Sequence, residues 1–192
     1  MNPSRSLFIA SIGNPGRLRN TRHSAGHILL DAVNPLLRTS LPFVYKTWTS
    51  PSYMNESGKK LVNELESFRR TLHAATAVTL VILHDELEKP LGKVVTKRGG
   101  AEKASFRGHN GLKDIFKWLD QKKLYMQGNN PSLSVLRIGV GIGRPAGRGP
   151  EEVSKYVLGR MEGTEEAAVK RAAAQVVDIL VQETGEEESP SP

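Results

Sequence analysis

Three short apolar runs are bounded by turn-forming or polar residues, and each predicts a buried β-strand. They are Leu7 to Ile12, which ends at the turn Gly13-Asn14-Pro15-Gly16, Ala77 to Leu83, and Val135 to Val140. The middle run is continuous and rich in β-branched and aliphatic residues, which is typical of a central strand in a parallel sheet. We expect this strand to end at His84-Asp85-Glu86.

Four other segments carry apolar residues at the three- and four-residue spacing of one helix face, and we predict helices there. The apolar positions are Ala25, Leu29, Ala32, Val33 and Leu36; Leu61, Leu65, Phe68 and Leu72; Leu112, Ile115, Phe116 and Leu119; and Val169, Ala172, Val176, Ile179 and Leu180. The last helix is expected to begin with Thr164 as its N-cap and to end at Gly185.

The order of these elements favours a single domain of the α/β class. Strands that alternate with helices predict a mixed, mostly parallel central sheet covered by helices on both faces. A length of 192 residues with 38% hydrophobic residues suits one core. We therefore expect one domain over residues 1–185, followed by a disordered acidic tail at residues 186–192.

Polar side chains near the predicted strand ends and helix starts mark the expected site. In α/β folds, ligands bind beyond the carboxyl ends of the strands. Asn14 follows the first strand, Asp85 follows the central strand, and Asn110 opens a helix. We expect these side chains to converge on one cleft, with His23 at the mouth of the helix that starts near Ala25.

Charge narrows the possible partners. The net charge is +7, but residues 161–192 hold eight acidic and two basic residues, so residues 1–160 carry +13 from 25 basic and 12 acidic residues. Such a field favours polyanions. The chain has no cysteine, which excludes disulfides and thiolate metal sites. The first apolar run is too short for a signal peptide or a membrane span, and we expect a cytoplasmic or mitochondrial protein without membrane contact.

His23 and Asp85 are the residues best suited to acid–base chemistry. Histidine can remove a proton from water near neutral pH when a carboxylate fixes its tautomer, although a histidine beside a helix start is more often a surface or capping group. Asn14, Asn55 and Asn110 lie in Gly- or Ser-rich turns and suit an uncharged, peptide-like substrate. Asn is also a common turn residue, and that interpretation stays open for each of them.

Metal and nucleotide sites are disfavoured. His23 and His27 are four residues apart, as in a metal-binding helix, but no glutamate lies between them and no third ligand is recognisable. Gly13-Asn14-Pro15-Gly16 and Gly99-Gly100 lack the lysine and hydroxyl of a nucleotide-binding loop. We therefore expect no metal and no cofactor.

Basic residues gather in three stretches and predict contact with nucleic-acid phosphate. They are Arg17, Arg19 and Arg22; Lys93, Lys97, Arg98, Lys103, Arg107 and Lys113; and Arg137, Arg144 and Arg148. Aromatic residues make up only 6% of the chain, so extensive stacking on single-stranded bases is not expected. The expected partner is a folded RNA recognised through its phosphates and shape.

A series of short motifs spans roughly residues 7–160. They are Ile12-Gly13-Asn14-Pro15-Gly16, Thr21-Arg22-His23, Tyr53-Met54-Asn55, Ser57-Gly58-Lys59, His84-Asp85-Glu86-Leu87, Gly108-His109-Asn110-Gly111-Leu112-Lys113-Asp114 and Leu136-Arg137-Ile138-Gly139. In this order they resemble the bacterial-type peptidyl-tRNA hydrolase family, and the ordered set is far more specific than any one motif.

The resemblance implies a monomeric, metal-free enzyme that hydrolyses the ester between a peptide and the terminal ribose of transfer RNA. Its partner would be the acceptor stem and 3′ end of peptidyl-tRNA. By this resemblance His23 would be the general base and Asp85 the carboxylate that orients it. Asn14 and Asn110 would bind the peptide end and place the water, Asn55 would hold His23 and the substrate, and Tyr53 would bind substrate. Lys97 and Arg137 would bind RNA phosphate.

The chain departs from the family pattern at several places. Ser24 stands where the family usually has Asn, the loop before His23 is short and lacks a tyrosine, and Val95 replaces a lysine that often binds phosphate. The segment between Pro42 and Tyr53 is missing a strand hairpin, which would leave a sheet edge unpaired, and residues 99–107 carry an insertion.

Two other functions compete with hydrolysis of peptidyl-tRNA. An inactive relative that serves as an RNA-binding module would need phosphate contacts but not a positioned base, so the retention of His23, Asp85 and the three asparagines argues against it. A small-molecule esterase or amidase would use the same site but leaves the +13 of residues 1–160 unexplained. Salt-sensitive binding to transfer RNA would separate the esterase from the others.

Overall fold

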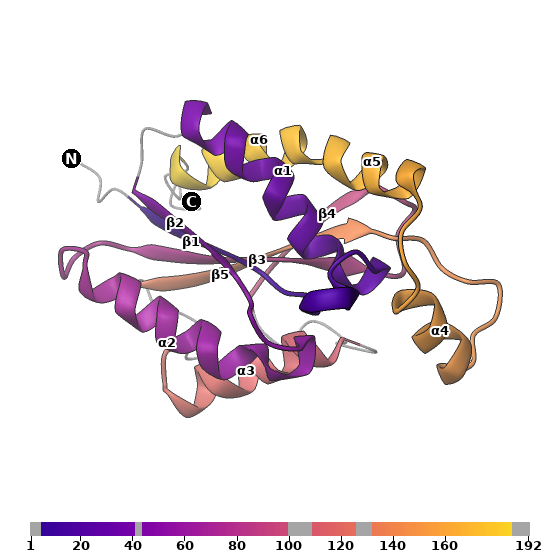
Figure 1. Cartoon of the computed structure of the whole chain (residues 1–192). Coiled ribbons are helices and arrows are strands. Elements are labelled where there is room, and N and C mark those ends of the chain that lie inside the picture. Colours follow the sequence, from indigo (N-terminus) through magenta and orange to yellow (C-terminus); the bar gives the residue numbers. More distant parts are fainter. Residues whose placement is uncertain (1–4, 41–43, 100–108, 126–131, 186–192) are drawn as a thin grey trace, which may run out of the picture.

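The computed structural model describes residues 5–40, 44–99, 109–125 and 132–185, and the strands in this part of the chain form one sheet. The strands are β1 (Ser6–Ser11), β2 (Tyr45–Thr49), β3 (Val78–Glu86), β4 (Val94–Arg98) and β5 (Leu133–Gly141), in the order β2-β1-β3-β5-β4. β4 runs antiparallel to β5, and the other neighbours are parallel. The predicted α/β fold with a mixed, mostly parallel sheet is confirmed (Figure 1).

Helices cover both faces of the sheet, as the apolar pattern predicts. The helices α1 (Ala25–Ser40), α5 (Gly163–Arg171) and α6 (Ala173–Gly185) lie on one face, and α2 (Ser57–Arg70) and α3 (Asn110–Gln121) lie on the other (Figure 1). The short helix α4 (Pro150–Val157) lies beyond the carboxyl ends of the parallel strands.

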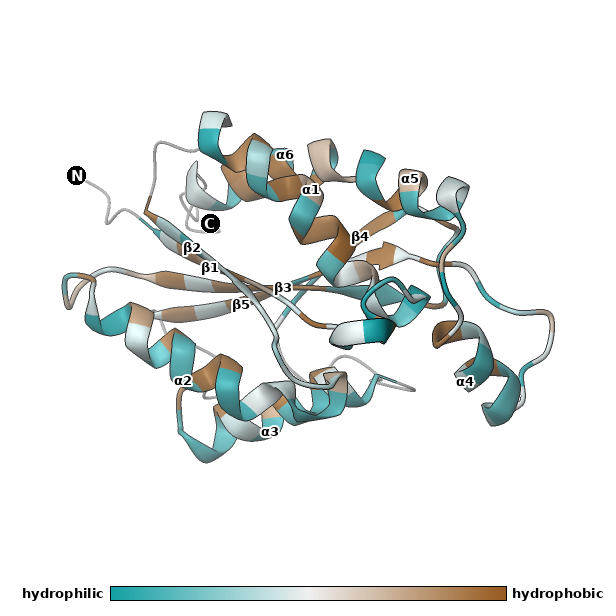
Figure 2. Cartoon of the chain, viewed as in Figure 1, coloured by the Kyte–Doolittle hydropathy of each residue, from teal (hydrophilic) through white to brown (hydrophobic). Residues whose placement is uncertain are grey.

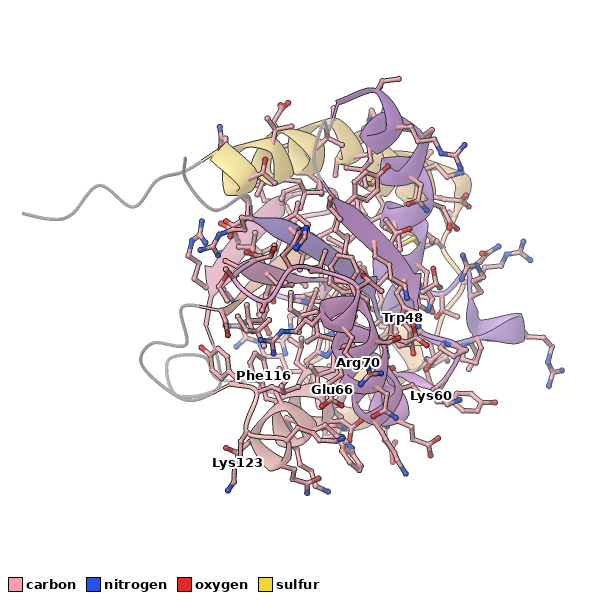
Figure 3. All side chains as sticks on the ribbon, turned by 90° about the vertical axis from the view of Figure 1, so that its left-hand side faces the viewer. Trp48, Lys60, Glu66, Arg70, Phe116 and Lys123 are labelled. Atoms are coloured by element: carbon pink, nitrogen blue, oxygen red, sulfur yellow. The ribbon has the colours of Figure 1, made fainter. Side chains whose placement is uncertain are left out.

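Successive side chains of the central strand β3 point to opposite faces of the sheet and so contribute to both hydrophobic cores. Val81 and Leu83 belong to the apolar cluster under α1 and α6, whereas Leu80 and Ile82 belong to the cluster under α2 and α3. All four side chains are fully buried. The helices match this pattern, since their apolar sides turn toward the sheet (Figure 2). Their polar residues, such as Lys60 on α2, extend outward (Figure 3).

The prediction for the C-terminal helix is wrong in two respects. It is split, because α5 ends at Arg171 and α6 begins at Ala173, although the end at Gly185 is as predicted. The N-cap is Glu162 rather than Thr164. The side chains of Glu162 and Glu165 each accept a backbone N–H of the other residue in a capping box, which Thr164 lies too far along the helix to form.

The apolar pattern does not predict β2, β4 or α4. Every residue of β2 is half-buried, and β4 has one fully buried residue, Val94, so neither shows a long apolar run. β2 pairs with β1 on one side and is the first strand in the order of the described sheet, so its outer edge has no strand partner among the described residues, as the missing hairpin led us to expect. The predicted acidic tail at 186–192 and most of the insertion at 99–107 lie outside the described residues. Among the helices within the described ranges, none is long and apolar enough to cross a membrane.

Candidate active site

His23 and Asp85 meet at the carboxyl end of the sheet. His23 lies in η2 (Arg22–Ser24), a single turn of 3₁₀ helix directly before α1, and Asp85 is the penultimate residue of β3. The Nδ1 atom of His23 is 3.1 Å from each carboxylate oxygen of Asp85. The His23 side chain is 17% exposed and that of Asp85 is 4% exposed. The imidazole therefore opens to solvent above a buried carboxylate.

Burial and charge act in opposite directions on this pair. Burial favours the neutral carboxyl, but the imidazoles of His23 and His109 outweigh it and hold the pKa of Asp85 well below its usual range. Burial also favours the neutral imidazole, but the charge and hydrogen bond of Asp85 raise the pKa of His23 above 6.5. Asp85 is consequently ionised at neutral pH, and His23 becomes a neutral base as the pH rises through its raised pKa.

His109 is a third member of the site that the sequence analysis did not single out. It is the N-cap of α3, where its Nδ1 accepts the backbone N–H of Leu112 at 3.3 Å. Its Nε2 is buried and lies 3.2 Å from Asp85 Oδ1. Because Nδ1 accepts, the neutral ring carries its proton on Nε2, toward the carboxylate. The available signal was its position at a helix start, next to Asn110.

A third histidine, His84, packs against His109. The Nδ1–H of His84 donates to the backbone carbonyl of Asp85 at 2.7 Å, and its ring meets that of His109 edge-on, with centroids 5.1 Å apart. Burial and then the nearby His109 lower the pKa of His84 to about 4. His84 is therefore neutral near pH 7, where it packs against His109 and holds the backbone of Asp85 through a hydrogen bond.

Asn14 is held beside His23 by two hydrogen bonds. Its side-chain Oδ1 accepts the backbone N–H of Met54 at 3.0 Å, and its own backbone N–H donates to Ser24 Oγ at 2.9 Å. Ser24 is fully buried and also donates to the carbonyl of Leu18 at 2.7 Å. Ser24, which departs from the family pattern, thus ties the Asn14 turn to the turn that carries His23.

The other predicted substrate-binding residues lie on the rim. Tyr53 is 59% exposed, Asn55 lies exposed in η3 (Met54–Glu56), and Asn110 is exposed at the start of α3. Met54 is buried and packs so closely on Gly111 that a Cβ there would be 2.5 Å from its Cγ, which brings η3 and α3 together. Within the described chain, no hydrogen bond joins Asn55 to His23, so the implied support of His23 by Asn55 is absent from this arrangement.

Lys97 and Arg137, the predicted phosphate-binding residues, are opposite one another in the β4–β5 ladder. The Lys97 side chain is half-exposed, and its Nζ lies 3.2 Å from Glu86 Oε2. Arg137 is only 3% exposed, and its guanidinium lies 6.0 Å from the ring centroid of Phe116. Lys97 can therefore meet a phosphate at the surface, whereas Arg137 lies beneath it. Among the described residues, no group of three His, Cys, Asp or Glu is arranged to hold a metal ion.

Comparisons of sequence show which known proteins the chain resembles. A family model described as peptidyl-tRNA hydrolase matches residues 8–189. The peptidyl-tRNA hydrolase of Actinobacillus succinogenes is 34% identical over 200 residues, which cover 94% of this chain and 92% of the relative. The probable peptidyl-tRNA hydrolase of Schizosaccharomyces pombe is 34% identical over 168 residues, which cover 82% of this chain and 73% of the relative.

Solved structures show the same similarity. A peptidyl-tRNA hydrolase in complex with N-propanol matches with a TM-score of 0.62 and 26% identity, covering 94% of this chain and 88% of that chain. The enzyme from Acinetobacter baumannii matches with a TM-score of 0.58 and 27% identity, covering 95% and 91%. The hydrogenase maturating endopeptidase HybD of E. coli, at 17% identity and a TM-score of 0.51 over 94% and 93%, shares the fold alone.

Proposed function

Because the chain belongs to the peptidyl-tRNA hydrolase family, we propose that it hydrolyses the ester between a peptide, or an N-blocked aminoacyl group, and the 3′-terminal ribose of tRNA. The reaction recycles tRNA from peptidyl-tRNA released by stalled ribosomes. The observation that carries the proposal is the contact of His23 Nδ1 with the buried, ionised Asp85. This contact leaves His23 Nε2 as the basic atom that faces the substrate.

In the proposed mechanism His23 is the general base. Its Nε2 takes a proton from water, and the water oxygen bonds to the ester carbonyl carbon. Asp85 fixes the tautomer and stabilises the imidazolium that forms. When the ester C–O bond breaks, the imidazolium returns the proton to the leaving ribose oxygen. The step needs no covalent intermediate.

Asn14 is the proposed donor to the substrate carbonyl. Because the Met54 N–H occupies its Oδ1, the group that Asn14 offers to a ligand is its amide NH₂. A donor held in place before the reaction stabilises the negative charge that develops on the carbonyl oxygen. Asn55, Asn110 and Tyr53, on the exposed rim, are proposed to bind the peptide end of the substrate.

Recognition of tRNA is proposed to rest on the positive charge of residues 1–160, with Lys97 as a phosphate contact near the site. Arg137 stays a predicted phosphate contact that would first have to become exposed. The proposal includes a monomeric enzyme and a cytoplasmic or mitochondrial location.

The decisive experiment measures peptide release from an N-acetylated aminoacyl-tRNA by the wild type and by His23→Ala, with a chelator present throughout. We expect release by the wild type and none by His23→Ala, while both bind the tRNA with similar affinity. Binding without release by either protein would identify an RNA-binding module. Release from small esters but not from tRNA would identify the small-molecule esterase.

A further inference from the structure

Arg22, the residue before His23, makes an unusually complete set of contacts. Its Nε and Nη2 donate to the two carboxylate oxygens of Glu165 on α5, both at 2.9 Å. Its Nη1 donates to the backbone carbonyl of Tyr156 on α4 at 3.3 Å, and its guanidinium carbon lies 4.4 Å from the centre of the Tyr156 ring. A two-point ion pair with ring contact fixes the orientation of a guanidinium more tightly than a single hydrogen bond does.

The ion pair is shielded from solvent. The side chains of Arg22 and Glu165 are 15% and 17% exposed, whereas those of the neighbouring pair Lys170–Glu166 are 53% and 33% exposed. Screening by water and salt is weak at such a partly buried pair. Arg22 is therefore held firmly, even though its partners lie more than 130 residues away in the chain.

The backbone around Arg22 is attached to the same region. The Arg22 N–H donates to the carbonyl of Gly159 at 3.1 Å, and the Met161 N–H donates to the carbonyl of Asn20 at 2.9 Å. Thr21 and Arg160 form an isolated antiparallel bridge between these two bonds. The link between α4 and α5 thus runs alongside the strand of chain that leads into His23.

These contacts continue to the strand that carries Asp85. The hydroxyl of Tyr156 donates to the carbonyl of Ile142 at 2.7 Å, directly after β5. The Ile142 N–H in turn donates to the carbonyl of Glu86 at 3.1 Å, one residue beyond Asp85. A continuous path therefore joins η2 to the end of β3 through Tyr156.

We propose that Arg22 is a positioning residue for the hydrolysis, and that its ion pair with Glu165 and its contact with Tyr156 set the alignment of His23 with Asp85. The two members of the catalytic pair lie on separate elements, η2 and β3, so their distance depends on how those elements are fixed to one another. Small misplacements of a catalytic group have large effects on rate. The inference rests on His23 being the general base.

The test compares Arg22→Gln, Arg22→Lys and Glu165→Gln with the wild type, and uses Glu166→Gln as the matched control on the same helix. Glu165→Gln keeps an oxygen that can accept the Glu162 N–H, so the start of α5 is preserved. We measure kcat and KM on an N-acetylated aminoacyl-tRNA, together with the melting temperature. We expect Arg22→Gln and Glu165→Gln each to lower kcat about tenfold with KM within about twofold. Arg22→Lys should recover part of the rate, and the double variant Arg22→Gln/Glu165→Gln should be no slower than either single one.

Each contrary result is distinct. A rise in KM with unchanged kcat would make Arg22 a substrate contact, and a lower melting temperature with unchanged kcat would make it a structural link only. Either outcome overturns the inference while leaving the hydrolase assignment in place. Failure of the wild type to release peptide, in contrast, overturns the proposed function itself. If Arg22→Gln does not fold, Glu165→Gln decides between these outcomes.

Discussion

The imidazole rings of His23 and His109 lie with their centroids 5.6 Å apart, and both face the same oxygen of Asp85. The Asp85 carboxylate therefore contacts two histidines that lie on different elements, η2 and the start of α3. His23 opens to solvent, whereas His109 is tied to the start of α3 through Leu112. His109 Nε2 lies 3.2 Å from the oxygen that His23 also faces, and we predict that it keeps Asp85 aligned as charge forms on His23.

Replacing His109 separates its two tasks. In His109→Asn the new side chain still caps α3, because Asn is a strong N-cap, but it is too short to reach Asp85. We expect kcat to fall about tenfold with little loss of stability. His109→Ala should show the same fall in kcat. Because it also removes the N-cap, it should lower the free energy of unfolding by about 1 kcal/mol. Steady-state kinetics measures kcat, and urea unfolding measures the free energy of unfolding. An unchanged kcat in His109→Asn would show that His109 acts only as the N-cap of α3.

Asp85→Asn tests the tautomer and the pH dependence together. In the wild type, kcat should rise as the pH increases through the pKa of His23, which lies above 6.5 because of Asp85. Without the negative charge this pKa falls, so the midpoint of the kcat profile should move to lower pH. The plateau should drop by about 100-fold or more, because the amide can hold the wrong imidazole tautomer. A profile of kcat from pH 5 to 9 measures both effects; a midpoint that stays in place would separate His23 from the titration.

Lys97→Met and Arg137→Met distinguish a surface cation from a buried one. Lys97→Met should weaken tRNA binding and reduce the slope of log affinity against log salt by about one. Arg137→Met should instead lower the free energy of unfolding and leave the slope unchanged, because Arg137 is buried against Phe116. Binding titrations at several salt concentrations, with urea unfolding, provide the comparison. A reduced slope for Arg137→Met would mean that Arg137 reaches phosphate after all.

Gly58 tests the packing that supports the rim of the site. A Cβ on Gly58 would lie 2.5 Å from the backbone oxygen of Asp114, whose carboxylate also accepts the Gly58 N–H at 2.7 Å. Gly58→Ala should therefore push α2 away from α3 and lower the free energy of unfolding by about 1–3 kcal/mol. Gly163→Ala is the control, because no atom lies within 4 Å of its added Cβ. Equal free energies of unfolding for the two variants would show that α2 and α3 can move apart at little cost.

Burial decides which helices and strands could be predicted from the sequence. β1, β3 and β5 are covered on both faces, so each contains a stretch of mostly apolar, buried residues, and α1, α2 and α3 each bury one regular stripe. The strands β2 and β4 lie at the sheet edges, where half of the surface meets water, and their sequences lack such a run.

The candidate site shows the same limit. His23 and Asp85 could be paired from the sequence because a base and a carboxylate at strand and helix ends suit one reaction. His109 could not, because its contact with Asp85 depends on how α3 sits over β3. The burial of Arg137 and the ion pair between Arg22 and Glu165 also arise only from tertiary packing. The spacing of residues along the chain does not predict these contacts, because they join residues that are far apart in the sequence.

The position of β5 between β3 and β4 has a consequence for synthesis. β4 precedes β5 in the chain, yet β5 is the strand with which it pairs in the described sheet. At ribosomal elongation rates of about 5–20 residues per second, residues 94–98 emerge on the order of seconds before residues 133–141. During that interval β4 lacks the strand with which it pairs in the described sheet, so Lys97 cannot take its position opposite Arg137. The edge that carries Lys97, the proposed phosphate contact, is thus completed late in translation, after most of the chain has been synthesised.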